Sequence, residues 1–426
     1  MLRMIFVVLI IIAGAFFAAQ SAFYTLLFYL WNAYFRPDDW TYGNFIRSLR
    51  LSWIIGAYLV LRTIIKLPNP KVGVSTVLIG LFLVQASICT YTSEHYQWSL
   101  NFLEDFFKVL IITYLIVVLV DTRAQFRMVL IVIAMSLGFE TAKQGWANLV
   151  LNPGAVNNNP IVFLGDNNGV ALGTMMLLPI LGALAQTSSR RTERWMHRFV
   201  SVGVFMRGIS TYSRGGFLGA AALGTIAVVR SGNKIRTLLG ICVLAGLVLS
   251  TMPQQFWDRM DTIYVENEEE RDDSSAGRLH FWRVGAQMAA AKPLTGVGLN
   301  SYNYSYQAYN TDDRFEGVRA AHSIWFGVMA DLGYVGLCLF VANIAAALWA
   351  AWRAVRMAGK DPRYRDLKLY GNAIISSLIV YAVTGSFLSL QYSEMTWHLF
   401  GLAAALHWVT KAEVAAAAQI PSRAVA

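Results

Sequence analysis

Apolar segments about as long as a lipid bilayer is thick recur along this sequence. A helix needs roughly 20 apolar residues to cross the hydrocarbon core of a bilayer. Segments near that length occupy residues 72–92, 106–120, 128–149, 238–252 and 369–390. Hydrophobic residues make up 56% of the chain and charged residues only 14%, against about 25% charged residues in a typical soluble domain. The sequence therefore predicts a protein that crosses a membrane many times, with helices as the spanning elements.

Lysine and arginine are unevenly shared among the loops between these segments. Loops rich in both occur at residues 122–127, 187–198, 230–236 and 353–368, and poorer loops at residues 93–105, 151–166, 253–320 and 391–395. Because Lys and Arg gather in cytoplasmic loops, the first set is predicted to face the cytoplasm and the second set the periplasm. The same rule accounts for the net charge of +10, so no nucleic acid partner is expected.

These patterns predict an all-α, polytopic integral membrane protein of the bacterial inner membrane, surrounded by membrane lipids, with about 12 transmembrane helices. Residues 1–252 are expected to form the N-terminal helices, residues 253–320 one large periplasmic loop, and residues 321–426 the last helices with a short cytoplasmic tail. Residues 1–35 resemble a signal peptide at first, but no polar cleavage region follows. We interpret them as one tilted or kinked pass, which puts both chain ends in the cytoplasm.

The predicted periplasmic loop changes character halfway. Residues 266–273 are mostly acidic, and we interpret them as a solvated segment, because like charges in a block repel one another and resist folding. Residues 278–291 combine aromatic, aliphatic and basic side chains and are followed by Pro293, which predicts a short amphipathic helix on the outer membrane surface. Asp38 and Asp39 are a rival acidic pair, which we interpret as a solvated turn. No metal site and no cofactor is therefore expected.

The four candidate arginines occur where the predicted topology disfavours positive charge. Arg214 lies between Ser213 and two glycines at a periplasmic turn. An arginine there can grip a phosphate through two parallel hydrogen bonds, or it can contact lipid headgroups. Arg207 lies seven residues earlier and deeper in the bilayer, which fits a functional residue and a buried structural ion pair equally well. Arg278 and Arg319 flank the same predicted vestibule.

His322 begins the predicted span that follows the large loop. An imidazole at the mouth of a membrane helix can serve as a general base, because its pKa lies near neutral pH; a bland interfacial histidine is the alternative. Asn167 and Asn168, after Asp166, enter the span that follows residues 151–166. They are expected to cap that helix or to contact sugar hydroxyls, which amides match as donors and acceptors. The arginines would hold a diphosphate leaving group while His322 takes a proton from an attacking hydroxyl.

Short motifs follow one another in a defined order. They are TYSRGGFLG at residues 211–219, AGR at 276–278 with Trp282, PLTGVG at 293–298, and His322 followed by Gly333 and Gly336. Their order and spacing resemble the O-antigen ligase/polymerase superfamily over roughly residues 150–350. GDNNGVAL at residues 165–172 is similar to O-glycosylation ligases, a branch of the same group.

The resemblance implies an inverting, metal-independent glycosyltransferase whose donor is an O-antigen glycan linked to undecaprenyl diphosphate. It also implies that Arg214 and Arg278 bind the diphosphate and that His322 is the base. A true O-antigen ligase uses lipid A-core as the acceptor. This is the function we expect, with the active site facing the periplasm.

Three alternatives stand beside ligation to lipid A-core. An O-antigen polymerase runs the same reaction with a second lipid-linked glycan as acceptor, and it often has two extended periplasmic loops where this sequence has one. A protein O-oligosaccharyltransferase would use the hydroxyl of a Ser, Thr or Tyr side chain. A transporter of lipid-linked glycans commonly contains inverted repeats and broken helices at mid-membrane, and the sequence has no such repeat.

Overall fold

The computed structural model describes residues 2–250, 254, 257 and 273–419. Helices make up 79% of it, and this described part contains no β-strand, so the all-α expectation is confirmed. The α-helices are α1 (Leu2–Ala18), α2 (Ala22–Phe35), α3 (Pro37–Trp40), α4 (Phe45–Ser48), α5 (Leu51–Lys66), α6 (Val74–Tyr91), α7 (Tyr96–Leu119), α8 (Arg123–Leu151), α9 (Asn167–Thr187), α10 (Arg191–Ile209), α11 (Arg214–Arg230), α12 (Lys234–Ser250), α14 (Asp273–Ala291), α15 (Tyr302–Tyr309), α16 (Ile324–Ala358), α17 (Arg365–Gly385) and α18 (Glu394–Gln419). Short 3-10 helices are η1 (Asp313–Phe315) and η2 (Pro362–Tyr364).

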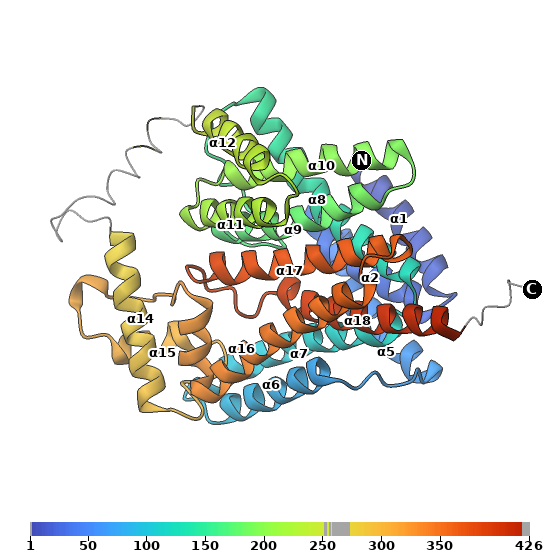
Figure 1. Ribbon diagram of the computed structural model, residues 1–426. Helices are drawn as coiled ribbons and strands as arrows, with labels where there is room; N and C mark the ends of the chain where they lie inside the picture. Colours follow the sequence, from blue (N-terminus) through green and yellow to red (C-terminus); the bar gives the residue numbers. More distant parts are fainter. Residues whose placement is uncertain (1, 251–253, 255–256, 258–272, 420–426) are drawn as a thin grey trace, which may run out of the picture.

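Six of the described helical segments are long and apolar enough to cross a bilayer, as expected of a multi-pass membrane protein. They are Phe45–Lys66, Val74–Tyr91, Arg123–Leu151, Asn167–Thr187, Ile324–Ala358 and Pro362–Gly385. Other long helices run beside them (Figure 1): α10 packs on α8 and α9, and α18 packs on α7 and α16. The total of about 12 spans stays a prediction.

Side chains from helices far apart in the sequence build the core of the bundle. Trp397 of α18 lies with its ring centroid 4.8 Å from that of Phe82 in α6 and 5.2 Å from that of Phe106 in α7. All three side chains are buried. A helix that is apolar all round can bury one side against its neighbours and leave the other to lipid, and the exposed Leu81 and Val84 of α6 follow this pattern.

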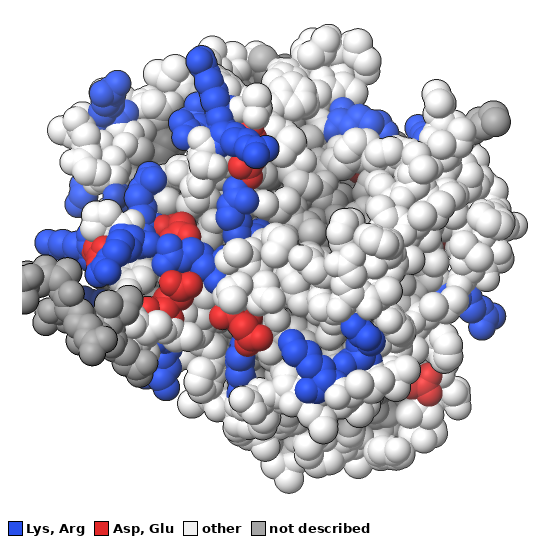
Figure 2. All heavy atoms as spheres, turned by 90° about the vertical axis from the view of Figure 1, so that its right-hand side faces the viewer, with Lys and Arg blue, Asp and Glu red and all other residues white. Residues whose placement is uncertain are grey.

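The two ends of the bundle differ, and we call them the loop end and the basic end. The loop end carries α14, α15 and residues 152–166 and 386–393. At the basic end, predicted cytoplasmic loops meet through ion pairs: Arg123 lies 3.4 Å from Asp366 and 3.1 Å from Glu413. Figure 2 shows Lys and Arg clustered on this end, with Asp and Glu among them. The fold thus gathers the basic loops at one end, while the membrane side that each end faces stays a prediction.

Residues 1–35 do not form the single pass that the sequence suggested. The described residues of this region form two packed helices, α1 and α2. The guanidinium of Arg3, at the start of α1, lies 5.2 Å from the ring centroid of Trp40, which follows α2, so the two helices run in opposite directions. Ser21 marks the turn between them, because its Oγ accepts a hydrogen bond from Tyr24 N at 3.2 Å and caps α2. The helix α1 therefore begins at the loop end, and the prediction that both chain ends lie at the basic end is wrong for α1.

The helix predicted at residues 278–291 is part of α14, which lies across the loop end (Figure 1). Its large buried apolar side chains include Phe281, Val284 and Met288, spaced three and four residues apart as on one side of a helix. They pack against α15 and the start of α16 in a small core of their own. The acidic residues 266–273, predicted to be solvated, lie outside the residues whose side chains the structure describes.

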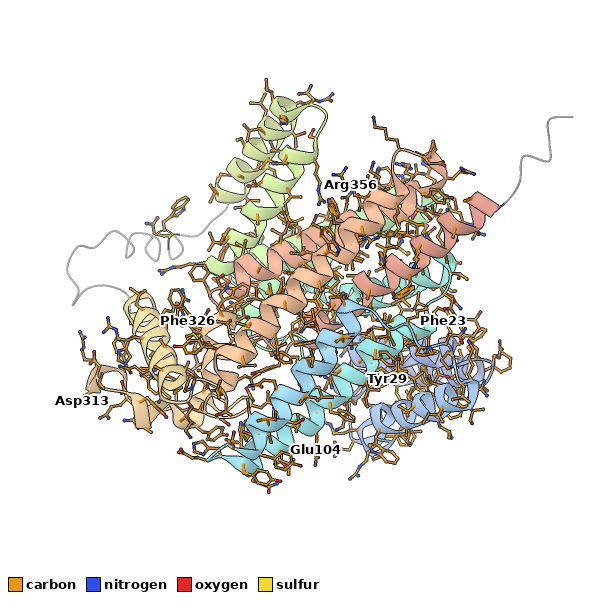
Figure 3. All side chains as sticks on the ribbon, turned by 60° about the horizontal axis from the view of Figure 1, so that its bottom comes forward. Phe23, Tyr29, Glu104, Asp313, Phe326 and Arg356 are labelled. Carbon is orange, nitrogen blue, oxygen red and sulfur yellow. The ribbon has the colours of Figure 1, made fainter. Side chains whose placement is uncertain are left out.

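The helix α16 is broken near its start, at Gly333, where φ is 68° and ψ is −172°. Figure 3 labels Phe326 before the break and Arg356 near the far end of the same helix. Only glycine adopts this conformation readily. A Cβ at Gly333 would also lie 2.5 Å from the carbonyl oxygen of Pro293, so the break requires glycine on two counts.

Residues 293–298, the PLTGVG motif, fill the break. A broken helix leaves backbone groups without their helical partners, and this segment supplies new ones: Val297 N donates to Ala330 O at 2.9 Å. The carboxylate of Asp331, which is almost fully buried, accepts from Tyr302 N at 2.9 Å. The motif thereby fixes the carboxyl end of α14 on α16.

Candidate active site

His322 lies in the turn just before α16, at the loop end. Its backbone is left-handed, with φ of 47°, and its N–H donates to Ser389 Oγ at 2.8 Å. Residues other than glycine rarely adopt this conformation, and those that do cluster at functional sites, where surrounding contacts hold them. The imidazole is half-buried, with its ring centroid 6.0 Å from that of Phe281 in α14. The turn thus holds His322 against the helix that carries Arg278.

Three influences act on the proton affinity of His322. Burial lowers its pKa below the ordinary value, and the positive charge of Arg278 lowers the pKa further, while the negative charge of Asp166 raises it. The net effect is a lowered pKa, so the imidazole is neutral at pH 7 and able to accept a proton. Arg278 and Asp166 thus lie near enough to His322 for their charges to act on its imidazole.

Asp166 precedes α9 at the loop end. Its Oδ1 accepts a hydrogen bond from Gly169 N at 2.8 Å, which confirms the capping role predicted for this segment. A Cβ at Gly169 would lie 2.0 Å from the carbonyl oxygen of Leu164. Glycine therefore allows the chain to turn tightly into α9. This turn holds the Asp166 carboxylate where its negative charge raises the pKa of His322.

Two asparagines link α9 to the turn before α11. Asn167 Nδ2 donates to Thr211 O at 2.6 Å, and Ser213 Oγ donates to Asn168 Oδ1 at 2.8 Å. Asn167 Oδ1 is buried and has no hydrogen-bond partner among the described residues. The contact of both amides with sugar hydroxyls stays a prediction.

Arg214 is the first residue of α11 and is half-buried. The glycines after it are needed for packing, because a Cβ at Gly216 would lie 2.9 Å from the Cβ of Ala171 in α9. The turn before it is fixed by Tyr212, whose hydroxyl donates to Gly154 O at 2.6 Å. A guanidinium at a helix N-terminus adds its charge to the positive end of the helix dipole, a combination that attracts anions.

Arg207 and Arg319 are placed differently from the other two arginines. Arg207 is fully buried, and it donates to the carbonyl oxygens of Asn157 at 3.1 Å and Asn159 at 2.6 Å. Its guanidinium therefore holds the segment before α9, which favours a structural role for Arg207. Its partners there are backbone carbonyl oxygens and not the acidic side chain of an ion pair. Arg319 is exposed, and its Nε donates to Glu316 O at 3.1 Å. A role in substrate binding stays a prediction for both.

Residues 199–341 match a family model described as O-antigen ligase. This segment is similar to an O-antigen ligase domain. This confirms the resemblance to the O-antigen ligase/polymerase superfamily, whose members are membrane glycosyltransferase-like enzymes. The domain contains the candidate residues Arg207, Arg214, Arg278, Arg319 and His322.

A second family model, for a family of unknown function (DUF5935), matches residues 1–182. Asp166, Asn167 and Asn168 fall in that range, outside the O-antigen ligase domain. The candidate residues therefore come from both matched segments, at the starts of α9, α11 and α16 and in α14. No curated protein matches the chain.

The surroundings of the O-antigen ligase domain include a segment that sequence reasoning missed. Residues 386–393 join α17 to α18, beyond the matched range. Ser389 accepts the backbone N–H of His322, and Ser386 Oγ accepts from Trp325 Nε1 at 2.8 Å. The signal in the sequence is a group of serines between two apolar spans, and such a group does not reveal its partners.

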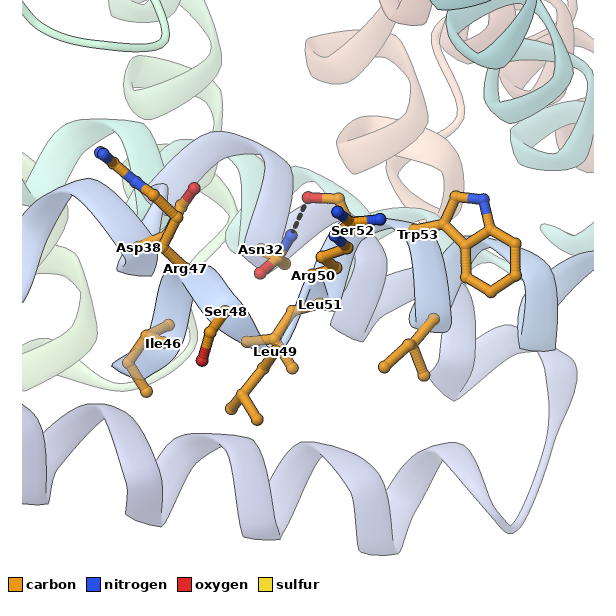
Figure 4. Close-up of a pocket in the computed structure, with 11 residues that line it drawn as sticks. Asn32, Asp38, Ile46, Arg47, Ser48, Leu49, Arg50, Leu51, Ser52 and Trp53 are labelled. Carbon is orange, nitrogen blue, oxygen red and sulfur yellow. Dashed lines mark hydrogen bonds between the residues drawn. The ribbon is translucent and has the colours of Figure 1, made fainter. Parts of the chain in front are cut away.

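A separate cavity of about 510 Å³ lies beside α2, α4 and α5 (Figure 4). Asp38 lines it, as do Asn32 and Ser52, which are joined by a hydrogen bond of 2.8 Å. Asp39 instead pairs with Arg47 at 2.8 Å. Within the described ranges, no group of three or more His, Cys, Asp or Glu side chains is placed to hold a metal ion. The two aspartates thus divide between a cavity wall and an ion pair.

Proposed function

We propose that the protein is an O-antigen ligase that transfers a glycan from undecaprenyl diphosphate to lipid A-core at the periplasmic face of the bacterial inner membrane. The observation that carries the proposal is a half-buried His322 of lowered pKa, within the fields of Arg278 and Asp166 and inside an O-antigen ligase domain. A neutral imidazole can accept a proton as a general base, and an arginine near it can stabilise the negative charge of a leaving group.

In the proposed reaction, the acceptor hydroxyl attacks the anomeric carbon of the donor sugar. Its proton passes to His322 as the new carbon–oxygen bond forms. The bond between the anomeric carbon and the diphosphate oxygen breaks on the opposite face, which inverts the configuration. The diphosphate leaves as a stable anion and takes no proton. Arg214 and Arg278 stabilise its charge, and a well-placed donor in a partly dry site contributes about 3 kcal/mol.

An apolar groove beside Arg214 supports a lipid-linked donor. It has a volume of about 740 Å³ and lies among α9, α10, α11 and α12. Ile209 and Phe217, on either side of Arg214 in the sequence, line it, and Thr225 is the polar exception among the described lining residues. No residue of α12 is buried, so this side of the groove is open to lipid. A polyprenyl chain in the groove would bring its diphosphate to the start of α11.

The proposed orientation puts the basic end in the cytoplasm and His322 on the periplasmic side. Support comes from the clustering of Lys and Arg at the basic end (Figure 2). With α1 and α2 as separate crossings, the expected number of spans rises by one above the total inferred from the sequence.

The first test is transfer by the purified protein, supplied with undecaprenyl-diphosphate glycan and lipid A-core in the presence of EDTA. We expect linked product from the wild type and a loss of about 10²–10⁴-fold in His322→Ala, the contribution of a general base. Donor binding should largely survive, because the imidazole acts on the acceptor proton. His95→Ala is the control, since His95 lies at the same end, before α7, and this variant should transfer at the wild-type rate.

Different products would assign different functions. Longer chains on the lipid carrier, without linked core, would make the protein an O-antigen polymerase and leave the site intact. Transfer to a Ser, Thr or Tyr hydroxyl would make it a protein O-oligosaccharyltransferase. Movement of the lipid-linked glycan across vesicles without a new glycosidic bond would make it a transporter. Equal transfer by His322→Ala and the wild type would remove the proposed base.

A further inference from the structure

A second cavity at the loop end is lined by residues outside the O-antigen ligase domain. Its volume is about 210 Å³, and its walls come from α1, α2, α3, α8 and residues 160–163. Arg3, Arg36, Trp40 and Glu140 supply much of its chemistry. The segment matched by the family of unknown function therefore contains a polar, aromatic-lined cavity of its own.

The acidic groups of this cavity are already paired. Glu140 lies 2.9 Å from Lys143, and its Oε2 accepts from Trp40 Nε1 at 3.2 Å. Asp39 lies 2.8 Å from Arg47. A ligand that enters the cavity meets carboxylates whose charge is balanced by their neighbours.

The arginines of the cavity retain hydrogen-bond donors. The guanidinium of Arg3 lies over the rings of Trp40 and Tyr42, 5.2 and 5.0 Å from their centroids. Arg36 Nε is buried and has no hydrogen-bond partner in the described part of the chain. Its Nη2 forms a long ion pair with Glu394 Oε1, at 3.6 Å. Buried donors are nearly always satisfied in native proteins, so the Nε of Arg36 favours an anionic ligand that supplies a further acceptor.

A third cavity adjoins the second one. Its volume is about 250 Å³, and it shares Val162 and Phe163 with the second cavity. Gly165 and Glu394 also line it. Gly165 directly precedes Asp166, whose charge acts on His322. The third cavity therefore lies between the arginines of the second cavity and the segment that carries Asp166.

The third cavity and the proposed diphosphate site use different faces of α9. Gly169 and Gly173 line the third cavity. Ala171 instead approaches Gly216 of α11, the helix that begins with Arg214. The third cavity and the diphosphate site therefore approach the start of α9 from different sides.

We propose that the second and third cavities bind the acceptor, with Arg3 and Arg36 holding a phosphate group on its saccharide. Two arginines from different segments of the chain suit a phosphate, which offers acceptor oxygens in several directions. This inference rests on the proposed function, because it names the acceptor side of the same site. The phosphate of a membrane lipid headgroup would present the same chemistry, and the experiment distinguishes the two sources.

The test compares Arg3→Ala and Arg36→Ala with the wild type in the transfer assay, in nanodiscs of phosphatidylcholine alone. We expect each variant to raise the KM for lipid A-core about tenfold, the effect of one charge-assisted hydrogen bond. The KM for the donor and kcat should stay unchanged. Arg50→Ala is the matched control, because Arg50 has φ of 47° where Arg36 has 51° but lines neither cavity. It should leave all three constants unchanged.

Phosphatase treatment of the acceptor separates the two sources of phosphate. If Arg36 binds acceptor phosphate, treatment raises the wild-type KM to that of Arg36→Ala and leaves the variant unchanged. If phosphatase treatment leaves the KM for the acceptor unchanged, and adding phosphatidylglycerol to the nanodiscs changes that KM instead, the arginines bind lipid headgroups and the proposal is overturned.

Direct binding separates a failure of this inference from a failure of the proposed function. The probe is soluble core oligosaccharide, with and without its phosphates, titrated calorimetrically into wild type and Arg36→Ala. Arg36-dependent binding of the phosphorylated form by a protein that makes no glycosidic bond would keep the subsite and overturn the ligase. If the wild type and both arginine variants transfer glycan with the same KM for the acceptor, the ligase function stands and the proposed acceptor subsite is overturned.

Discussion

At the scale of single residues, His322 owes its chemistry to side chains remote from it in the sequence. Arg278 disfavours its protonated form and Asp166 favours it. The sequence could single out Arg278 and His322, because ionisable residues at predicted periplasmic helix ends are few and costly. It could not single out Asp166 as a neighbour of the base, nor Ser389 as its backbone partner, because a capping aspartate and a loop serine are ordinary until the fold shows what they face.

Charge removal around His322 should move the acid limb of the pH–rate profile in opposite directions. Only the neutral imidazole accepts a proton, so kcat/KM falls as the pH drops through its pKa. Arg278→Gln removes a charge that lowers this pKa, so activity should be lost at a higher pH, beside a fall in rate of about 10²–10³-fold. Asp166→Asn removes a charge that raises the pKa, so its acid limb should move to lower pH.

The measurement is kcat/KM for both variants and the wild type over about pH 5 to 8. Asn is as good a helix cap as Asp, so Asp166→Asn should fold normally. Acid limbs at one pH in all three proteins would show that neither charge acts on the base.

At the scale of elements, the break in α16 separates what the sequence could predict from what it could not. The helix at residues 278–291 was predictable, because its apolar residues recur at helical spacing and Pro293 ends it. The break was not, because Gly333 in a long apolar run is compatible with an uninterrupted helix. Its requirement for glycine comes from the approach of Pro293, a contact that the sequence does not show.

Gly333→Ala should destabilise the fold by about 1–3 kcal/mol, the usual cost of a residue held in a disfavoured backbone conformation. Thermal unfolding in detergent measures the change as a lowered Tm. Gly80→Ala, in α6, is the control, because a Cβ there meets nothing within 4 Å, and alanine is the better helix former. An equal Tm for the two variants would count against a strained break.

At the scale of the whole molecule, the positions of the basic loops were predictable and the path of the first residues was not. Each basic loop repeats the same signal, so the alternation constrains the fold strongly. Residues 1–35 carry no such signal between α1 and α2. The turn there is held by the Ser21 cap and by Thr25 Oγ1, which donates to Ala18 O at 3.0 Å.

The hairpin of α1 and α2 predicts that the two ends of the described chain face opposite sides of the membrane. In a cysteine-free background, Leu2→Cys should react with a membrane-impermeant maleimide added outside spheroplasts. Ala412→Cys, in α18, should react only after permeabilisation. Both positions are exposed in the fold. Labelling of both from the same side would restore the single pass for residues 1–35.

The segment that fills the break in α16 also determines how Arg278 can move. The helix α14 ends at Ala291 and continues at once into residues 293–298, which are bonded into α16. Arg278 lies near the other end of α14, about 20 Å away at 1.5 Å per residue. Phe281, three residues after Arg278, is packed in the small core with α15 and the start of α16, so α14 is held near both of its ends. Catalytic positioning depends on shifts of about 1 Å. In the proposed reaction, this double anchorage would limit such shifts of the guanidinium.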